Sequence, residues 1–193
     1  MDAAIKRGIT FVQSVLFATI ALSLITGGAI FFEQASLASR INDTQRITTS
    51  LQSEMRGLFN RDGLLSQMED GATLTKTVIT AGGAPSSAVS GDDLVNPWDG
   101  GIAITAENGG REFRITMTNI PDFACARIIP LDKTGSGPAG TGVTRLQITG
   151  AAQDHVHTVP EDGAVGPSRA AELCDDATES ASERVTVAWN YTR

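Results

Sequence analysis

The chain has 193 residues, of which 41% are hydrophobic and 5% aromatic, and its formal net charge at pH 7 is −7. Binding to nucleic acid needs a basic face, so with this acidic balance a footprint of that kind is not expected. The length allows one domain of ordinary size beyond any anchor, with enough apolar residues for a core.

The first expected element is an apolar helix over Ile9–Phe32, a stretch without an ionisable side chain. It would be roughly 36 Å long, and a bilayer core needs about 20 apolar residues. We therefore predict that this stretch spans a membrane. Lys6 and Arg7 stand just before it and Glu33 just after it. The positive-inside rule then leaves the N-terminus in the cytoplasm and the rest of the chain outside.

Two other interpretations of this stretch stay open on the residues alone. The first is a secretory signal peptide that is cut after Ala38. The apolar part of a signal peptide is normally about 7–15 residues long, which is shorter than Ile9–Phe32. The charged Glu33 would also lie between this apolar part and the cut, which disfavours a signal peptide. The second is a plain single-pass anchor that is never cut. All three interpretations place the remainder of the chain beyond the membrane.

Residues 33 to about 60 are expected to continue the same helix, because no proline precedes Pro85. A spacing of four and three residues puts a partly apolar stripe on one helix face, with Gln52 and Arg56 off it. The stripe consists of Leu37, Ile41, Thr44, Thr48, Leu51, Met55 and Leu58. The run Asn60–Gly63 is typical of a helix end. Such a stripe needs a domain to cover it.

The segment 63–193 is expected to supply that cover as an antiparallel sheet. Alternating residues predict a hairpin from Ile102–Thr105 and Phe113–Thr118 around a turn at Glu107–Gly110. Asp99-Gly100-Gly101 is a second turn signal. Further strands are expected at Thr73–Thr80, Val143–Thr149 and Val185–Tyr191, the last of which would end the chain inside the sheet.

The other parts of this segment are expected to be short helices or loops. Pro121 suits a first helical position, so a short helix that carries Cys125 is expected there. Leu64, Leu65 and Met68 are consistent with another short helix. Two runs rich in glycine, proline and charge are expected to be exposed loops, Lys133–Gly142 and Ala151–Arg169.

Cys125 and Cys174 are the two cysteines of the chain, and the predicted topology puts both outside the membrane. An oxidising compartment favours their pairing. The enclosed loop of about 50 residues would be worth about 3–4 kcal/mol in the chain-entropy model. Two free buried thiols remain the alternative. A zinc site is disfavoured because neither cysteine has a second ligand at finger spacing.

No motif in the sequence carries a recognisable catalytic or metal-binding chemistry. His155 and His157 would share a strand face but lack a third ligand, and the acidic pairs at 92–93 and 175–176 lack calcium-loop spacing. Gly135–Gly140 matches a dinucleotide pattern by letters yet precedes a strand instead of a helix. Neither a nucleophile elbow nor a helical zinc motif occurs. We expect no enzyme activity, no metal and no cofactor.

Two groups of residues resemble a known family. In the first, a short basic leader ends in glycine and an apolar helix begins at once. This boundary resembles the prepilin signal of type IV pilins and pseudopilins, and it reads Lys6-Arg7-Gly8-Ile9-Thr10-Phe11-Val12-Gln13. The second group resembles the head of type IVb pilins, above all the subunits of conjugative thin pili and toxin-coregulated-type pili. It comprises Asn96-Pro97-Trp98-Asp99-Gly100-Gly101, the hairpin, Asn119-Ile120-Pro121 before Cys125, the late Cys174 and the C-terminal strand.

The resemblance implies an α+β pilin fold, in which a long N-terminal helix, half transmembrane, packs on a C-terminal antiparallel sheet. Its parts would be a leader at 1–8, a hydrophobic helix at 9–32, an amphipathic half of the same helix at 33–62 and a globular head at 63–193. It also implies leader cleavage between Gly8 and Ile9 and N-methylation of Ile9. Gln13 would act in assembly register, at a position where the family usually has glutamate. Cys125 and Cys174 would form a disulfide bond.

The function implied is that of a structural subunit of a type IVb-like pilus, which polymerises through its hydrophobic helix. Expected partners are copies of the chain, a prepilin peptidase, the inner-membrane assembly platform and the membrane before assembly. The chain would lie in the bacterial inner membrane with its head in the periplasm, and later in an extracellular pilus. A secretion pseudopilin or minor pilin, and a membrane-anchored periplasmic binding domain, stay open as alternatives.

Overall fold

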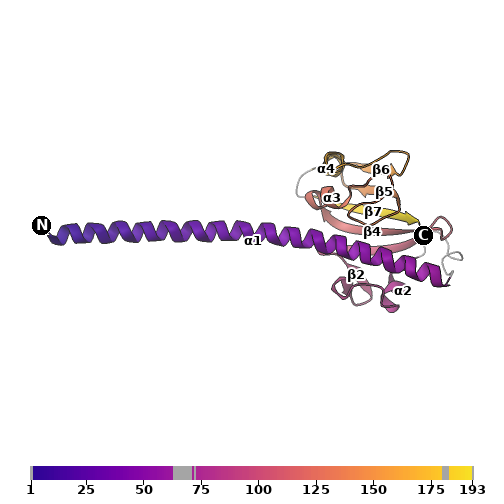
Figure 1. Cartoon of the computed structure of the whole chain (residues 1–193), viewed down its shortest axis with the longest axis horizontal. Coiled ribbons are helices and arrows are strands. Elements are labelled where there is room, and N and C mark those ends of the chain that lie inside the picture. The colour runs from indigo at the N-terminus through magenta and orange to yellow at the C-terminus, as the bar shows by residue number, and fades with distance from the viewer. Residues whose placement is uncertain (1, 63–70, 72, 180–182, 193) are drawn as a thin grey trace. The chain divides into compact units, whose positions relative to one another are not determined.

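The computed structural model describes residues 2–62, 71, 73–179 and 183–192 (Figure 1). Along the first helix it describes the backbone throughout and the side chains at 13, 15–20 and 34–58. The chain divides into two compact units, Met1–Ser39 and Arg40–Arg193, and we call the second unit the head. The short helix expected at Leu64, Leu65 and Met68 lies outside the described residues.

Helix α1 runs without a break from Asp2 to Asp62. This confirms one continuous helix that ends close to the predicted stop at Asn60–Gly63. Most side chains of the Ile9–Phe32 stretch lie outside the described ones, so membrane spanning by this stretch stays a prediction. In the part of the chain that the structure describes, no helix is long and apolar enough to cross a membrane.

Within the described residues the head is built on one seven-stranded sheet, and every neighbouring pair of strands is antiparallel. The order across the sheet is β1-β2-β3-β4-β7-β5-β6. The C-terminal strand β7 lies between β4 and β5, which confirms that the chain ends as a strand inside the sheet. The strands are β1 (Val89–Ser90), β2 (Asp93–Val95), β3 (Gly101–Glu107), β4 (Glu112–Pro121), β5 (Val143–Thr149), β6 (Asp154–Thr158) and β7 (Arg184–Thr192).

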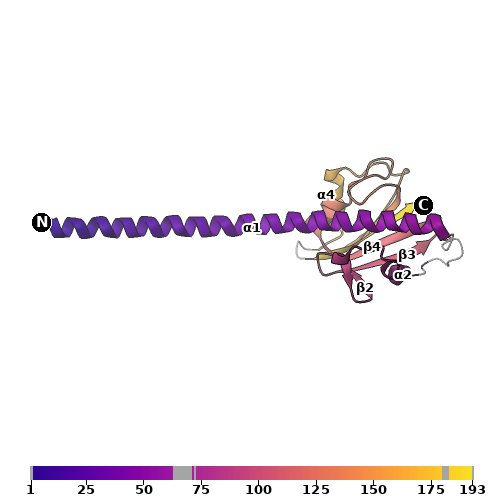
Figure 2. The ribbon, with the colours of Figure 1, turned by 60° about the horizontal axis from the view of Figure 1, so that its bottom comes forward.

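The part of α1 that belongs to the head lies across one face of this sheet (Figure 2). The predicted stripe is buried there at Ile41, Thr44, Thr48, Leu51 and Met55, whereas Leu37 is 37% exposed. The hydroxyls of Thr44 and Thr48 donate to the carbonyl oxygens one turn earlier, both at 2.8 Å. Because these bonds satisfy the hydroxyls, threonine can occupy a buried helix face without an unpaired polar group.

Alternating residues on the central strands form the other side of the core. Ile115 on β4 is opposite Trp189 on β7, and Trp189 is opposite Leu146 on β5; all three are fully buried. Fully burying a side chain of this kind contributes about 1.5–3 kcal/mol. The predicted hairpin is confirmed as β3 and β4, and β5 and β7 match the predicted strands to within one residue.

The strand predicted at Thr73–Thr80 is wrong, because Thr75–Thr80 form the short helix α2. The backbone N–H of Leu74 donates to the carbonyl oxygen of Ile104 at 2.8 Å, and the Thr75 hydroxyl accepts from the Ile104 N–H at 3.0 Å. These two contacts satisfy the backbone N–H and carbonyl groups of Ile104 on β3. The helix also places Thr75 and Val78 in the core. Tertiary contacts therefore override the strand propensity of threonine, valine and isoleucine.

Other expected boundaries also change in the structure. Pro121 is the last residue of β4 and caps α3 (Asp122–Ile128), which carries Cys125 as predicted but begins one residue later. The loop expected at Ala151–Arg169 contains β6 and the start of α4 (Pro167–Asp176). A single-turn 3-10 helix, η2, covers Ser86–Ala88. The run Lys133–Gly142 is not wholly exposed, since Gly135, Ala139 and Gly140 are buried in it.

Candidate functional site

The predicted site residues fall in two different units of the chain. Gly8, Ile9 and Gln13 lie on α1 in the first unit, where the Gln13 side chain is exposed and that of Ile9 lies outside the described ones. Leader cleavage, N-methylation and a register role at these three positions stay predictions. Cys125 and Cys174 lie in the head.

Cys125 and Cys174 form a disulfide bond that joins α3 to α4, with Cα atoms 6.0 Å apart. Both are buried, and α4 turns Ala170, Leu173 and Cys174 to the inside at helical spacing. The predicted pairing is present in the structure, and the alternative of two free thiols is wrong. The bridge fixes two surface helices whose own contacts with the sheet are small.

The run Asn96–Gly101 forms a tight turn that its own side chains hold. The side-chain oxygen Oδ1 of Asn96 accepts from the N–H groups of Trp98 and Gly100 at 2.8 and 3.2 Å, and its side-chain amide donates to the carbonyl oxygen of Thr118. A Cβ atom at Gly100 would overlap the backbone of Thr118. The turn therefore needs asparagine at one position and glycine at the other.

The turn presents Trp98 as a contact between α1 and α3. The indole N–H donates to the Thr44 hydroxyl at 3.2 Å, and the Arg40 guanidinium lies 5.6 Å from the ring centroid. Arg40 also donates to the carbonyl oxygen of Pro97 at 3.0 Å. The Phe123 ring meets Trp98 edge to face, with centroids 5.6 Å apart. Trp98 thus ties α1 to the region that the disulfide closes.

A second connection between α1 and the rest of the head involves two residues outside the predicted apolar stripe. Gln52 donates to the carbonyl oxygen of Thr141, and Arg56 donates to the same oxygen at 2.7 Å. Arg56 reaches the Thr141 hydroxyl at 3.2 Å and the carbonyl oxygen of Thr192 at 3.4 Å. A Cβ atom at Gly140 would overlap the Gln52 side chain. Only the tertiary structure brings these segments together.

The two histidines lie on β6 and not in a loop. His157 is hydrogen-bonded through its ring to the carbonyl oxygen of Gly163 at 2.9 Å, and His155 is half-buried opposite Ile148. Across the described ranges, no three histidine, cysteine or acidic side chains gather as metal ligands would.

The architecture is that of a pilin: a long helix covers an antiparallel sheet, the C-terminal strand lies inside that sheet, and a disulfide joins two helices beside it. The family model described as PilS N terminal matches residues 38–190, and the chain belongs to this family. Among solved structures, it is similar to TcpA, a type IV pilin from Vibrio cholerae El Tor biotype. The identity is 14%, the TM-score is 0.52, and the match covers 80% of this chain and 99% of that one. No curated protein matches the chain.

The chain is therefore a type IVb pilin, a structural subunit of an extracellular pilus and not an enzyme. The predicted α+β fold class is confirmed. Family membership does not favour the alternatives of a secretion pseudopilin or a membrane-anchored binding domain.

Proposed function

We propose that the chain is made as a prepilin that is anchored in the inner membrane by Ile9–Phe32. A prepilin peptidase cuts it between Gly8 and Ile9 and methylates Ile9, and an inner-membrane platform adds it to a growing filament. The observation that carries this proposal is that α1 is continuous from Asp2 to Asp62 and contains the whole uncharged stretch directly after Lys6-Arg7-Gly8. One helix can therefore serve both as membrane anchor and as filament contact.

The driving force is the exchange of one apolar environment for another. Before assembly, lipid surrounds Ile9–Phe32; afterwards, the same stretches of neighbouring copies surround one another. Burying more than about 1,000 Å² of apolar surface contributes tens of kcal/mol at about 25 cal/mol per Å². The entropy lost when the subunits become ordered in the filament reduces this gain. A filament held in this way needs no covalent link between its subunits.

Extraction from the membrane applies force to α1, so the head must be firmly attached to it. The stripe at Ile41–Met55 supplies the apolar part of that attachment. The Trp98 contact and the Gln52–Thr141 contact supply polar connections near its two ends. These contacts attach the sheet and its helices to the part of α1 that lies within the head.

Gln13 takes the position at which the family usually has glutamate. An amide can still hydrogen-bond to the amino terminus of a neighbouring copy, and it costs less than a carboxylate at membrane depth. We propose that register in this filament relies on a hydrogen bond at Gln13 and not on a charge pair.

The leader junction is tested by Gly8→Asp. An aspartate at the cut should leave an uncleaved precursor in the membrane and no pili, because the peptidase would have to accept a charged side chain at its cleavage position. Gly57→Asp is the matched control, since Gly57 is exposed on the same helix and a Cβ there meets nothing within 4 Å. It should be cleaved and assembled as the wild type is.

The measurement is the mass of the mature N-terminus from membranes and sheared pili. A chain that begins at Ile9 and carries one added methyl group supports the proposal. A chain that begins at Met1 or Ser39, or a Gly8→Asp variant that matures normally, contradicts it.

A further inference from the structure

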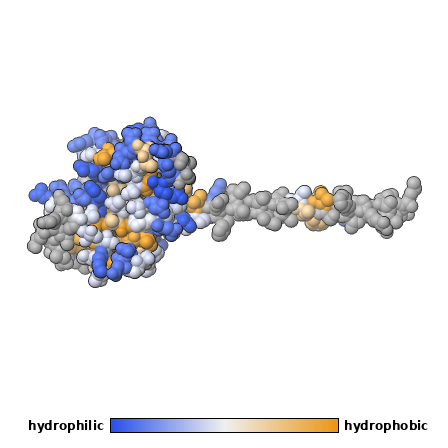
Figure 3. Space-filling model, turned by 180° about the vertical axis from the view of Figure 1, so that it is seen from behind, coloured by the Kyte–Doolittle hydropathy of each residue, from blue (hydrophilic) through white to orange (hydrophobic). Residues whose placement is uncertain are grey.

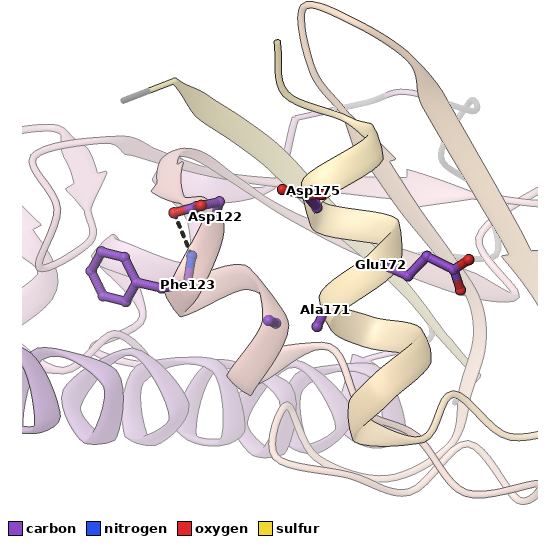
Figure 4. A pocket seen from close by; sticks show the side chains of 6 residues that line it. Asp122, Phe123, Ala171, Glu172 and Asp175 are labelled. Carbon is purple, nitrogen blue, oxygen red and sulfur yellow. Dashed lines mark hydrogen bonds between the residues drawn. The ribbon is translucent and has the colours of Figure 1, made fainter. Parts of the chain in front are cut away.

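The two helices joined by the disulfide border a groove of about 480 Å³ on the head. Figure 4 shows Ala171 and Asp175 on the flank of α4 nearest α3, while the Phe123 ring and the Glu172 carboxylate point outward. Because Cys125 and Cys174 bridge the helices, the two walls are held at a set distance. The lining residues are Asp122, Phe123, Ala126, Ala171, Glu172 and Asp175.

The groove suits a cationic side chain with an aliphatic stem. Within the described residues, Asp175 has no side-chain partner, and the Asp122 carboxylate accepts only the adjacent N–H of Phe123 at 2.6 Å. Glu172 is paired with Arg169. The alanines leave room for a stem, and Phe123 adds a 40% exposed ring at one end. Arginine and lysine lay such stems on apolar surface and keep the charge at the rim.

The Phe123 wall of the groove is connected to α1 through the buried Trp98. Phe123 packs on Trp98, and Trp98 lies between Phe123 and Arg40 of α1. In the proposed filament, a neighbouring copy that packs its own α1 alongside this helix would bring the exposed cations of that helix to this part of the head.

Among the α1 arginines whose side chains the structure describes, Arg46 is the one that is free to fill it. Arg40 lies on Trp98 and Arg56 binds Thr141, whereas Arg46 is exposed and forms no ion pair with any described residue. Asp43, one turn earlier, is exposed on the same helix but is not within ion-pair distance of it. We propose that the α3–α4 groove of one copy binds Arg46 of a second copy. This inference rests on the proposed function, since it requires a filament in which α1 helices pack together.

Charge reversal tests the pairing in the full chain, with sheared pili as the readout. Asp175→Arg and Arg46→Asp should each lower pilus yield on the order of tenfold, because each replaces an attraction with a repulsion at every subunit contact. The double variant should recover most of the yield. Asp176→Arg is the matched control, because Asp176 is exposed on α4 but does not line the groove. Wild-type yield from both single variants, or no recovery in the double variant, overturns the proposal.

A second measurement avoids any change of charge. Phe123→p-benzoylphenylalanine places a photoreactive ring at the groove, and irradiated pili should yield dimers joined to α1 within a few residues of Arg46. Val156→p-benzoylphenylalanine is the control, since Val156 is 58% exposed on β6, outside the groove. Dimers from Phe123 that are joined elsewhere, or a lack of dimers in assembled pili, overturn the pairing.

The oxidised mass of each variant and its resistance to protease in membranes show whether the head still folds. Failure of this inference is distinct from failure of the proposed function. Wild-type chains that begin at Ile9 and form pili, combined with silent charge reversals, refute only the groove contact. Wild-type chains that are never cut after Gly8 refute the proposed function itself.

Discussion

Tyr191 is the single tyrosine of the chain, and it is fully buried on β7. Its hydroxyl donates to the carbonyl oxygen of Ala139 at 2.7 Å, and its ring stacks on Phe113 with centroids 5.2 Å apart. Burial raises the pKa of this phenol far above its usual value, and nearby Arg56 opposes the shift only in part. One residue therefore connects the core, the glycine-rich run before β5 and the C-terminal strand.

Alkaline titration should consequently unfold the head before Tyr191 ionises. The folded-state pKa is raised, so the stabilisation is fully present below the unfolded-state value near pH 10 and is lost as the pH rises, at up to about 1.4 kcal/mol per pH unit. Tyrosinate absorbance and loss of circular dichroism should coincide. Tyr191→Phe should cost about 1 kcal/mol at neutral pH and remove this tyrosine-linked part of the alkaline loss. Tyrosinate formed near pH 10 with intact structure would contradict the burial argument.

At the scale of elements, α3 and α4 depend on each other more than on the sheet. Both are helices beside the sheet, and the disulfide bond between Cys125 and Cys174 links them covalently. Proline at the first turn of α4 and the inward spacing of Ala170, Leu173 and Cys174 give the helix its start and its buried face. A helix of ten residues is marginal without such support.

Loss of the bridge should therefore loosen α4 selectively. Cys125→Ser combined with Cys174→Ser should lower the free energy of unfolding by about 3–4 kcal/mol. Amide exchange should rise most in Pro167–Asp176 and least in β4 and β7. Ser168→Ala, an exposed change on the same helix, serves as the control. A uniform rise across the sheet would show that the bridge supports the whole head instead.

At the scale of the molecule, charge and apolar surface are separated along the chain. Lys6 and Arg7 balance Asp2 and Glu33, so the net charge of −7 falls on the head. Figure 3 shows hydrophilic residues across the upper part and the sides of the head, with a group of hydrophobic residues lower down on the same face. Net charge of one sign keeps such bodies apart in solution, so we assign the main attraction between subunits to the apolar part of α1.

A fragment that begins at Leu37 should then remain monomeric. It keeps the buried stripe of α1, Arg46 and the whole sheet but lacks Ile9–Phe32, so it lacks the main attraction between subunits. Sedimentation of this fragment, compared with the full chain after removal of detergent, measures the difference. Filaments formed by the fragment alone would place the main contact in the head and contradict the role given to the helix.

The sequence by itself determined the features that short-range patterns encode. The spacing of Ile41, Thr44, Thr48, Leu51 and Met55 predicted the buried helix face, alternation predicted the hairpin and the strands at 143–149 and 185–191, and cysteine count with topology predicted the bridge. The leader residues Gly8 and Ile9, and Gln13 beyond them, remain sequence-based predictions.

Tertiary structure alone decided the rest, because the deciding contacts join residues far apart in the chain. Thr75–Thr80 forms a helix since Ile104 binds Leu74 and Thr75 at the edge of β3. From the sequence, Gln52 and Arg56 lie off the apolar stripe of the helix. In the structure, both donate hydrogen bonds to the carbonyl oxygen of Thr141. The α3–α4 groove is lined by residues from two helices that are far apart in the sequence and that the bridge joins. Local periodicity specifies which face of an element is buried, whereas only the folded chain specifies what that face meets.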